Sequence, residues 1–85
     1  MAFGKLVKAI KIRESNRDRL MALLQIDPLA EDPEERLPLD WFVVLPFGEH
    51  GRSFYELLNP EVFHEMVDDT DKKALDNGFY EVRLR

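Results

Sequence analysis

The segment HEMVD, residues 64–68, holds the strongest metal-ligand pattern in the chain. A histidine followed by glutamate, with a ligand-capable side chain four positions after the histidine, resembles the zinc-hydrolase motif H-E-x-x-H, whose two ligands share one helix face. Asp68 stands where that motif has its second histidine, and no third ligand stands out nearby. A metal-dependent hydrolase built on His64, Glu65 and Asp68 is therefore an alternative. The favoured interpretation is a partly exposed helix end that binds no metal and no cofactor.

Other catalytic groups are sparse. His50, in the segment GEHG, lies on a glycine-bounded turn from which it could act as a general base. The chain has no cysteine, and neither Ser15 nor Ser53 has the glycine setting of a nucleophile elbow. The sequence therefore predicts a protein that is not an enzyme.

Charge is distributed unevenly along the 85 residues, whose net charge is −5. Residues 1–26 hold six basic and two acidic side chains, and residues 27–85 hold six basic and fifteen acidic side chains. The basic side chains of the first part are Lys5, Lys8, Lys11, Arg13, Arg17 and Arg19. They support a second hypothesis, a nucleic-acid-binding module, which the overall acidity opposes.

The composition and the N-terminal residues bear on the compartment of the protein. Without cysteine there is no disulfide framework to indicate an oxidising compartment. Lys5, Lys8 and Lys11 interrupt the apolar N-terminal run, which excludes the core of a signal peptide. No segment approaches the roughly 20 apolar residues of a membrane span. We expect a cytoplasmic protein.

Hydrophobic periodicity and turn signals predict six elements in the order β-α-β-β-α-β. Strands are expected at residues 3–13, 40–47, 53–58 and 79–85. The first helix follows a capping box of Ser15 and Asp18 and ends before Pro28. The connection 27–38 is acidic and proline-rich, with one helical turn at 33–36.

The second helix is expected to begin at Asn59-Pro60, because asparagine caps well and proline suits the first helical position. The run DDTD interrupts this helix, and a further helical piece from Thr70 to Leu75 would stop at Asn77-Gly78. The last strand is one-sided, since Tyr80, Val82 and Leu84 share a face.

This order predicts a single α+β domain over residues 1–85 with a ferredoxin-like antiparallel sheet. In that arrangement the second strand is an edge, and both helices lie on one face of the sheet. The alternative is a small curled β-barrel with helices, in which the second face of the sheet lies inside.

The segment DWFVVLPF, residues 40–47, is apolar on both faces of the expected strand. In the ferredoxin-like arrangement one of those faces has no cover, so a partner is expected to dock on it. Buried aromatic residues dominate interface energies, and the predicted partner-binding residues are Trp41, Phe42, Phe47, Phe54 and Tyr55. The partner would be a host protein or a second copy in a homodimer.

Several short motifs between residues 7 and 67 are similar to those of a family of small bacteriophage proteins with a Gly-Asp-Tyr/Trp signature. The matching positions are Ala9-Ile10, Asp40-Trp41, Gly51, Tyr55, Pro60 and Phe63. Leu39 departs from the family's glycine, and residues 70–85 extend past its usual end. The family has no assigned catalytic residues. The resemblance implies a viral origin and a non-enzymatic role as an inhibitor or accessory factor that binds a host protein.

Overall fold

The computed structural model of the chain describes residues 5–46 and 55–85. Within these residues it forms five strands, three α-helices and one 3₁₀ turn. In chain order they are β1 (Leu6–Lys11), α1 (Glu14–Leu23), α2 (Pro33–Arg36), β2 (Phe42–Pro46), β3 (Glu56–Leu58), α3 (Pro60–Met66), β4 (Val67–Ala74), η1 (Asp76–Gly78) and β5 (Tyr80–Leu84).

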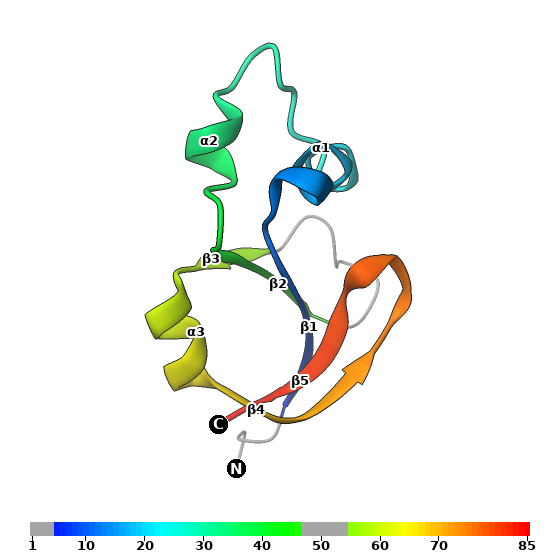
Figure 1. Cartoon of the computed structure of the whole chain (residues 1–85), viewed down its shortest axis with the longest axis vertical. Helices are drawn as coiled ribbons and strands as arrows, with labels where there is room; N and C mark the ends of the chain where they lie inside the picture. Colours follow the sequence, from blue (N-terminus) through cyan, green and yellow to red (C-terminus); the bar gives the residue numbers. More distant parts are fainter. Residues whose placement is uncertain (1–4, 47–54) are drawn as a thin grey trace.

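The five strands form one antiparallel sheet in the order β3-β2-β1-β5-β4. Figure 1 shows this sheet curling into a half-barrel, with α3 on its open side. The alternative of a small curled barrel with helices is therefore confirmed. The ferredoxin-like arrangement is wrong, because β2 lies between β1 and β3 instead of at an edge. The last strand pairs with β1, as Leu6 opposite Arg83 shows.

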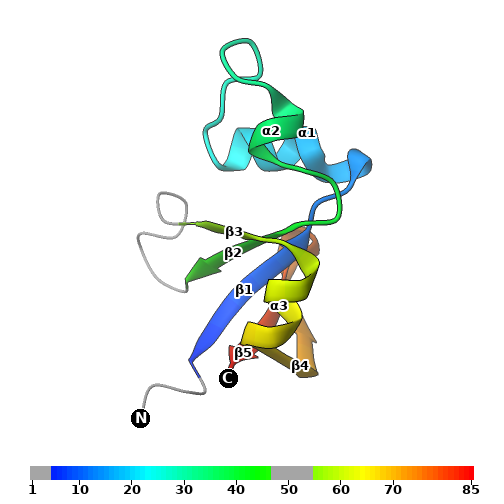
Figure 2. The same ribbon diagram turned by 90° about the vertical axis from the view of Figure 1, so that its left-hand side faces the viewer.

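The sheet is apolar on both faces and supports two separate cores. The α1-side core consists of Ile10, Ile12, Leu20, Met21, Leu24, Ile26, Leu37, Val43, Leu45 and Phe79. The α3-side core consists of Val7, Ala9, Phe42, Val44, Phe63, Val67 and Val82. Figure 2 shows α1 and α2 together at one end of the molecule and α3 against the sheet. The expectation that both helices cover one face is therefore wrong.

The alternation predicted along β2 is confirmed. Val43 and Leu45 belong to the α1-side core, while Phe42 and Val44 belong to the α3-side core. All four are buried. A strand that is apolar on both faces must be covered twice, and this chain covers it with its own α1 and α3. The described part of β2 therefore leaves no apolar face for a partner.

Helix α3 begins as predicted. The Val62 N–H donates to the Asn59 Oδ1 at 2.8 Å, and Pro60 occupies the first helical position. The helix presses Phe63 onto Phe42, with ring centroids 3.8 Å apart and ring planes within 4° of parallel. Phe63 is 1% exposed, so this stacked pair lies at the centre of the α3-side core.

The segment after α3 differs from the prediction. Residues 67–74 form β4 rather than a second helical piece, and β4 returns through η1 to pair with β5. Asn77 and Gly78 both have positive φ, +63° and +81°, and the Leu75 N–H donates to the Phe79 carbonyl at 2.8 Å. An Asn-Gly pair supplies left-handed backbone to a hairpin turn as well as to a helix end. Here the hairpin forms.

Helix α1 starts two residues earlier than its predicted capping box, whose N-cap was Ser15. Its N-cap is Arg13, whose backbone N–H donates to the Asn16 Oδ1 at 2.9 Å. The Asn16 Nδ2 in turn donates to the Lys11 carbonyl at 2.9 Å. Asn16 is therefore buried with its amide bonded to the backbone on both sides of the β1–α1 junction. Ser15 and Asp18 are exposed positions within the helix. No described helix is long and apolar enough to cross a membrane.

Candidate functional site

The most prominent feature outside the two cores is the arm, which we define as residues 27–36. It leaves the domain between two buried residues, Ile26 and Leu37, which are 5% and 0% exposed. Figure 1 shows it projecting beyond α1 at one end of the longest molecular axis. The residues on both sides of the arm therefore belong to the α1-side core.

The end of α1 sets the direction in which the arm leaves. Gln25 has a φ of +59°, and its N–H donates to the Ala22 carbonyl at 3.2 Å. The Ile26 N–H donates to the Met21 carbonyl at 2.9 Å. These two bonds form a Schellman motif, with a buried contact between Met21 and Ile26 in the α1-side core. The chain therefore turns sharply out of α1 without leaving its last carbonyls unpaired.

Side chains of the arm cap its own turns. The Asp27 Oδ1 accepts from the Leu29 N–H at 2.9 Å, and its carbonyl accepts from the Glu31 N–H at 3.0 Å. The Asp32 Oδ1 accepts from the Glu34 N–H at 2.9 Å and caps α2, which confirms the predicted helical turn. Aspartate commonly fixes local backbone in this way. The acidic residues of this loop thus shape it as well as solvate it.

Two arginines fasten the arm to the body of the protein. The Arg36 Nη2 donates to the Tyr55 hydroxyl at 2.7 Å, and its Nη1 forms an ion pair with Glu31. The Arg17 Nε donates to the Leu37 carbonyl at 3.1 Å. These bonds join the arm to α1 and to the residue before β3, so the arm is held in one orientation.

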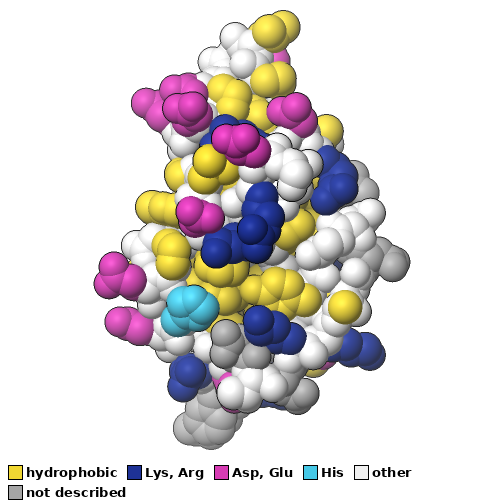
Figure 3. Space-filling model, viewed as in Figure 1, with side chains coloured by type: hydrophobic (Ala, Val, Ile, Leu, Met, Phe, Trp, Pro, Cys, Tyr) yellow, Lys and Arg dark blue, Asp and Glu magenta, His cyan; other side chains and the backbone are white. Residues whose placement is uncertain are grey.

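The tip of the arm is apolar and exposed. Pro28, Leu29 and Ala30 are all exposed, and Leu29 reaches 96%. Figure 3 shows hydrophobic side chains at the very end of the molecule, with acidic side chains gathered below them. A single exposed leucine needs no explanation, but Leu29 lies at the end of an ordered projection and is flanked by Asp27 and Glu31. The arrangement suits a contact with an apolar pocket that has a basic rim.

The predicted aromatic anchors do not form an exposed cluster. Phe42 is 5% exposed and stacked on Phe63, so the chain itself covers its ring. Trp41 and Tyr55 are half-buried and pack against the α1-side core. The Tyr55 hydroxyl also accepts a hydrogen bond from Arg36.

The remaining predicted anchors, Phe47 and Phe54, lie outside the described residues, as does His50 of the glycine-bounded turn.

The basic side chains predicted to bind nucleic acid are divided between the two faces of β1. Alternation along the strand puts Lys11 on the side of the α3-side core, with its Nζ 6.0 Å from the Phe42 ring centre, and Lys8 on the opposite side. Lys5 precedes β1 and is exposed. Arg17 is used internally against Leu37. The structure does not bring these cations together as one patch.

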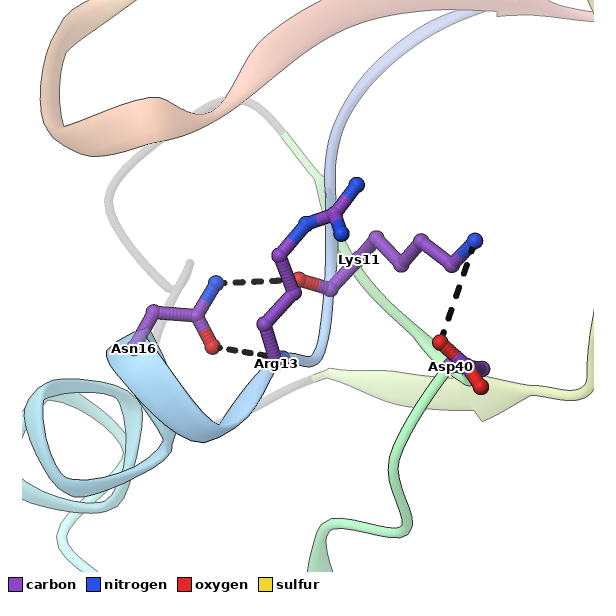
Figure 4. Close-up of polar contacts among 4 residues, drawn as sticks. All are labelled: Lys11, Arg13, Asn16 and Asp40. Carbon is purple, nitrogen blue, oxygen red and sulfur yellow. Dashed lines mark hydrogen bonds and ion pairs between the residues drawn. The ribbon is translucent and has the colours of Figure 1, made fainter.

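Figure 4 shows the junction between β1 and α1, which carries two of these cations, Lys11 and Arg13. The Lys11 Nζ lies 3.9 Å from the Asp40 Oδ1, and both side chains are substantially exposed. Such a pair contributes little to stability. Asp40 has a φ of +72°, and its N–H donates to the Ile12 carbonyl at 2.9 Å. Lys11 thus extends toward an acid, and Arg13 is exposed.

The metal pattern of residues 64–68 is not realised. Helix α3 ends at Met66, so Asp68 belongs to β4 and does not share a helix face with His64. The Asp68 Oδ1 accepts from the hydroxyl and the N–H of Thr70, which lower the pKa of that carboxyl group. Among the described residues no group of three or more metal-ligating side chains occurs. The helical spacing on which the motif depends is absent because Val67 adopts an extended conformation.

Sequence reasoning treated the arm only as a solvated connection. The signal for its tip is the triplet Pro28-Leu29-Ala30 between Asp27 and Glu31, an apolar interruption of an acidic stretch. Nothing in that pattern states whether the leucine turns inward or outward. The anchoring of Arg36 on Tyr55, which joins residues 19 positions apart, becomes visible only in the folded chain.

Comparisons with known proteins give no assignment for this fold and arm. No family model, no curated protein and no solved structure matches the chain.

Proposed function

We propose that this chain is a small non-enzymatic protein-binding module, encoded by a phage or mobile element, that docks on a host protein through the tip of its arm. The observation that carries the proposal is Leu29, 96% exposed at the end of an ordered, hydrogen-bonded projection. A protein gains nothing in stability from holding a leucine in water at that position. A binding role explains why the arm is nevertheless ordered.

The energetics of the arm favour binding. Ordering a loop at an interface opposes association, and a loop already held in its bound form avoids much of that loss. Arg36 and Asp32 hold the arm before any partner arrives. Burying the Leu29 side chain against a partner then contributes on the order of 1.5–3 kcal/mol. That amount is typical of a single anchoring residue at an interface.

The charge of the arm supports a basic partner. The acids on the arm are Asp27, Glu31, Asp32, Glu34 and Glu35. Complementary charge across an interface speeds encounter and excludes unsuitable partners. An apolar pocket rimmed by lysine or arginine is therefore the surface that the tip of the arm fits.

The biological setting of the proposal rests on the resemblance to small bacteriophage proteins. Asp40-Trp41, Pro60 and Phe63 are among the matching positions. A chain of this size that acts on a host enzyme or defence component would be an inhibitor or accessory factor in the host cytoplasm. The proposal needs no cofactor and no catalytic residue.

Affinity capture from host lysate, quantified by mass spectrometry, tests the proposal. The bait proteins are the wild type, Leu29→Ser and a matched control, Met66→Ser, whose residue is 41% exposed on α3. We expect the wild type and Met66→Ser to capture the same specific protein and Leu29→Ser to lose it. Arg36→Gln, which frees the arm from Tyr55, should weaken the same capture. Equal capture by wild type and Leu29→Ser, or no specific capture at all, overturns the proposal.

A further inference from the structure

A groove lies beside α1, close to the turn that joins β4 to β5. Its volume is about 330 Å³, and its lining residues are Arg19, Leu20, Ala22, Leu23, Asn77 and Phe79. Leu20 and Phe79 belong to the α1-side core, so the floor of the groove is apolar. Of these lining residues only Arg19 is charged, which gives the groove a basic rim.

The turn that forms one side of the groove is fixed against α1. Gly78 has a φ of +81°, and a Cβ there would lie 3.4 Å from the Ile10 Cδ1 and 3.7 Å from the Arg19 Nη2. The glycine therefore allows the turn to lie close to both side chains. The Arg19 guanidinium group therefore lies at the rim of the groove, beside this turn.

The tip of the arm has the opposite character. It presents Leu29 between Asp27 and Glu31, an apolar side chain with an acidic surround. We propose that the tip of the arm docks in the groove of a second copy of this chain, with Leu29 on the apolar floor and Asp27 facing Arg19. This inference goes beyond the proposed function, because it gives the same tip a second partner that excludes the host protein while it is bound.

The tip of the arm follows the groove closely in the chain but is directed away from α1, which favours contact with the groove of another copy. Only residues 24–26 separate α1 from the arm, and the Schellman motif directs the chain outward. The Arg36–Tyr55 bond then holds the base of the arm to the residue before β3. Figure 1 and Figure 2 place α1 and the arm at the same end of the molecule. Two copies can therefore exchange tips about a two-fold axis, which gives a closed dimer with two identical contacts.

Self-association of the full chain tests the inference directly. Sedimentation velocity over a concentration series up to about 1 mM, where weak contacts are detectable, should show a monomer–dimer equilibrium for the wild type. Leu29→Ser alters the tip, and Ala22→Asp places an acid at an exposed position of the groove. Each should raise the dissociation constant at least about tenfold, while Met66→Ser leaves it unchanged. Circular dichroism confirms that each variant is folded.

Cross-linking identifies the contact, because the chain has no cysteine of its own. Leu29→Cys and Ala22→Cys, mixed and treated with a short thiol-to-thiol cross-linker, should form a 22–29 heterodimer in higher yield than either variant alone forms a homodimer. A wild type that stays monomeric overturns the inference, as does a dimer unaffected by Leu29→Ser and Ala22→Asp. If Leu29→Ser nevertheless loses its captured host protein, the proposed function stands and only the second copy is excluded.

Discussion

Replacing Phe42 by alanine tests whether its ring lies in a core, as the structure has it, or on an outward face of the strand, as the sequence suggested. Phe42 is 5% exposed and stacks on Phe63, itself 1% exposed, at a centroid distance of 3.8 Å. Truncation of a buried phenylalanine to alanine costs about 3–5 kcal/mol through lost burial and the cavity left behind. A domain of this size has roughly 4–13 kcal/mol of total stability. Phe42→Ala should therefore remove much of the free energy of unfolding.

Urea denaturation followed by the fluorescence of Trp41, the one tryptophan of the chain, measures this loss. Trp41 is half-buried on the opposite face of the strand, so it reports unfolding without touching the mutated side chain's core. Leu29→Ala, at a 96% exposed position, is the matched control and should change the free energy of unfolding by less than about 0.5 kcal/mol. A loss below about 1 kcal/mol for Phe42→Ala would mean that its ring is not in the core, and would refute the two-core description.

Substitutions at three further positions test local features. Asn59→Ala removes the acceptor of the Val62 N–H and should lower the free energy of unfolding by about 1 kcal/mol, whereas Asn59→Asp should retain most of it; equal urea midpoints for all three proteins would contradict this. Gly78→Ala forces a Cβ onto a φ of +81° and should destabilise the hairpin by about 1 kcal/mol or more, seen as a lower thermal midpoint; an unchanged midpoint would show that the turn relaxes freely. Hydrogen bonds from Thr70 lower the pKa of Asp68 in the folded protein. The stabilising effect of the Asp68 carboxylate is therefore complete above its ordinary pKa near 3.8, and it is lost as pH falls through the lower pKa of the folded state. Asp68→Asn should flatten that acid limb in urea titrations between pH 2 and 7, and a limb as steep as the wild type's would count against the bond.

Much of the secondary structure follows from the sequence because local signals and packing agree there. Asn59-Pro60 starts α3, and residues 33–36 form the expected helical turn. The alternation of β2 is also correct. The sheet order is not, because a strand that is apolar on both faces fits a central position as well as an uncovered edge. Only the placement of α1 and α3 on opposite faces distinguishes the two.

The hairpin of β4 and β5 shows the same ambiguity at shorter range. The pair Asn77-Gly78 predicts a helix end, yet left-handed backbone serves a hairpin turn equally well. Thr70, β-branched and close to the start of the segment, favours the extended form. Pairing with β5 decides the outcome, and such pairing is a tertiary contact that residue patterns alone do not contain.

The candidate site was the least predictable part. Aromatic type alone marks Phe42 and Tyr55 as anchors, but Phe42 packs in the α3-side core and Tyr55 holds the arm through Arg36. A single leucine in an acidic, proline-rich connection carries no periodicity, so no periodic signal in the sequence marks Leu29. Its exposure follows from the buried residues on either side of the arm, Ile26 and Leu37, and from the bonds of Arg36.

Photo-cross-linking from position 29 tests the central claim, that the tip of the arm is a protein contact, most directly. Benzoylphenylalanine is introduced in place of Leu29, or in place of Met66 as the control at another exposed apolar position. After irradiation in the host lysate, we predict a specific adduct to one protein, or to a second copy, from position 29 and none from position 66. Equal adduct patterns from both positions, or no adduct from position 29, would contradict a docking role for the arm.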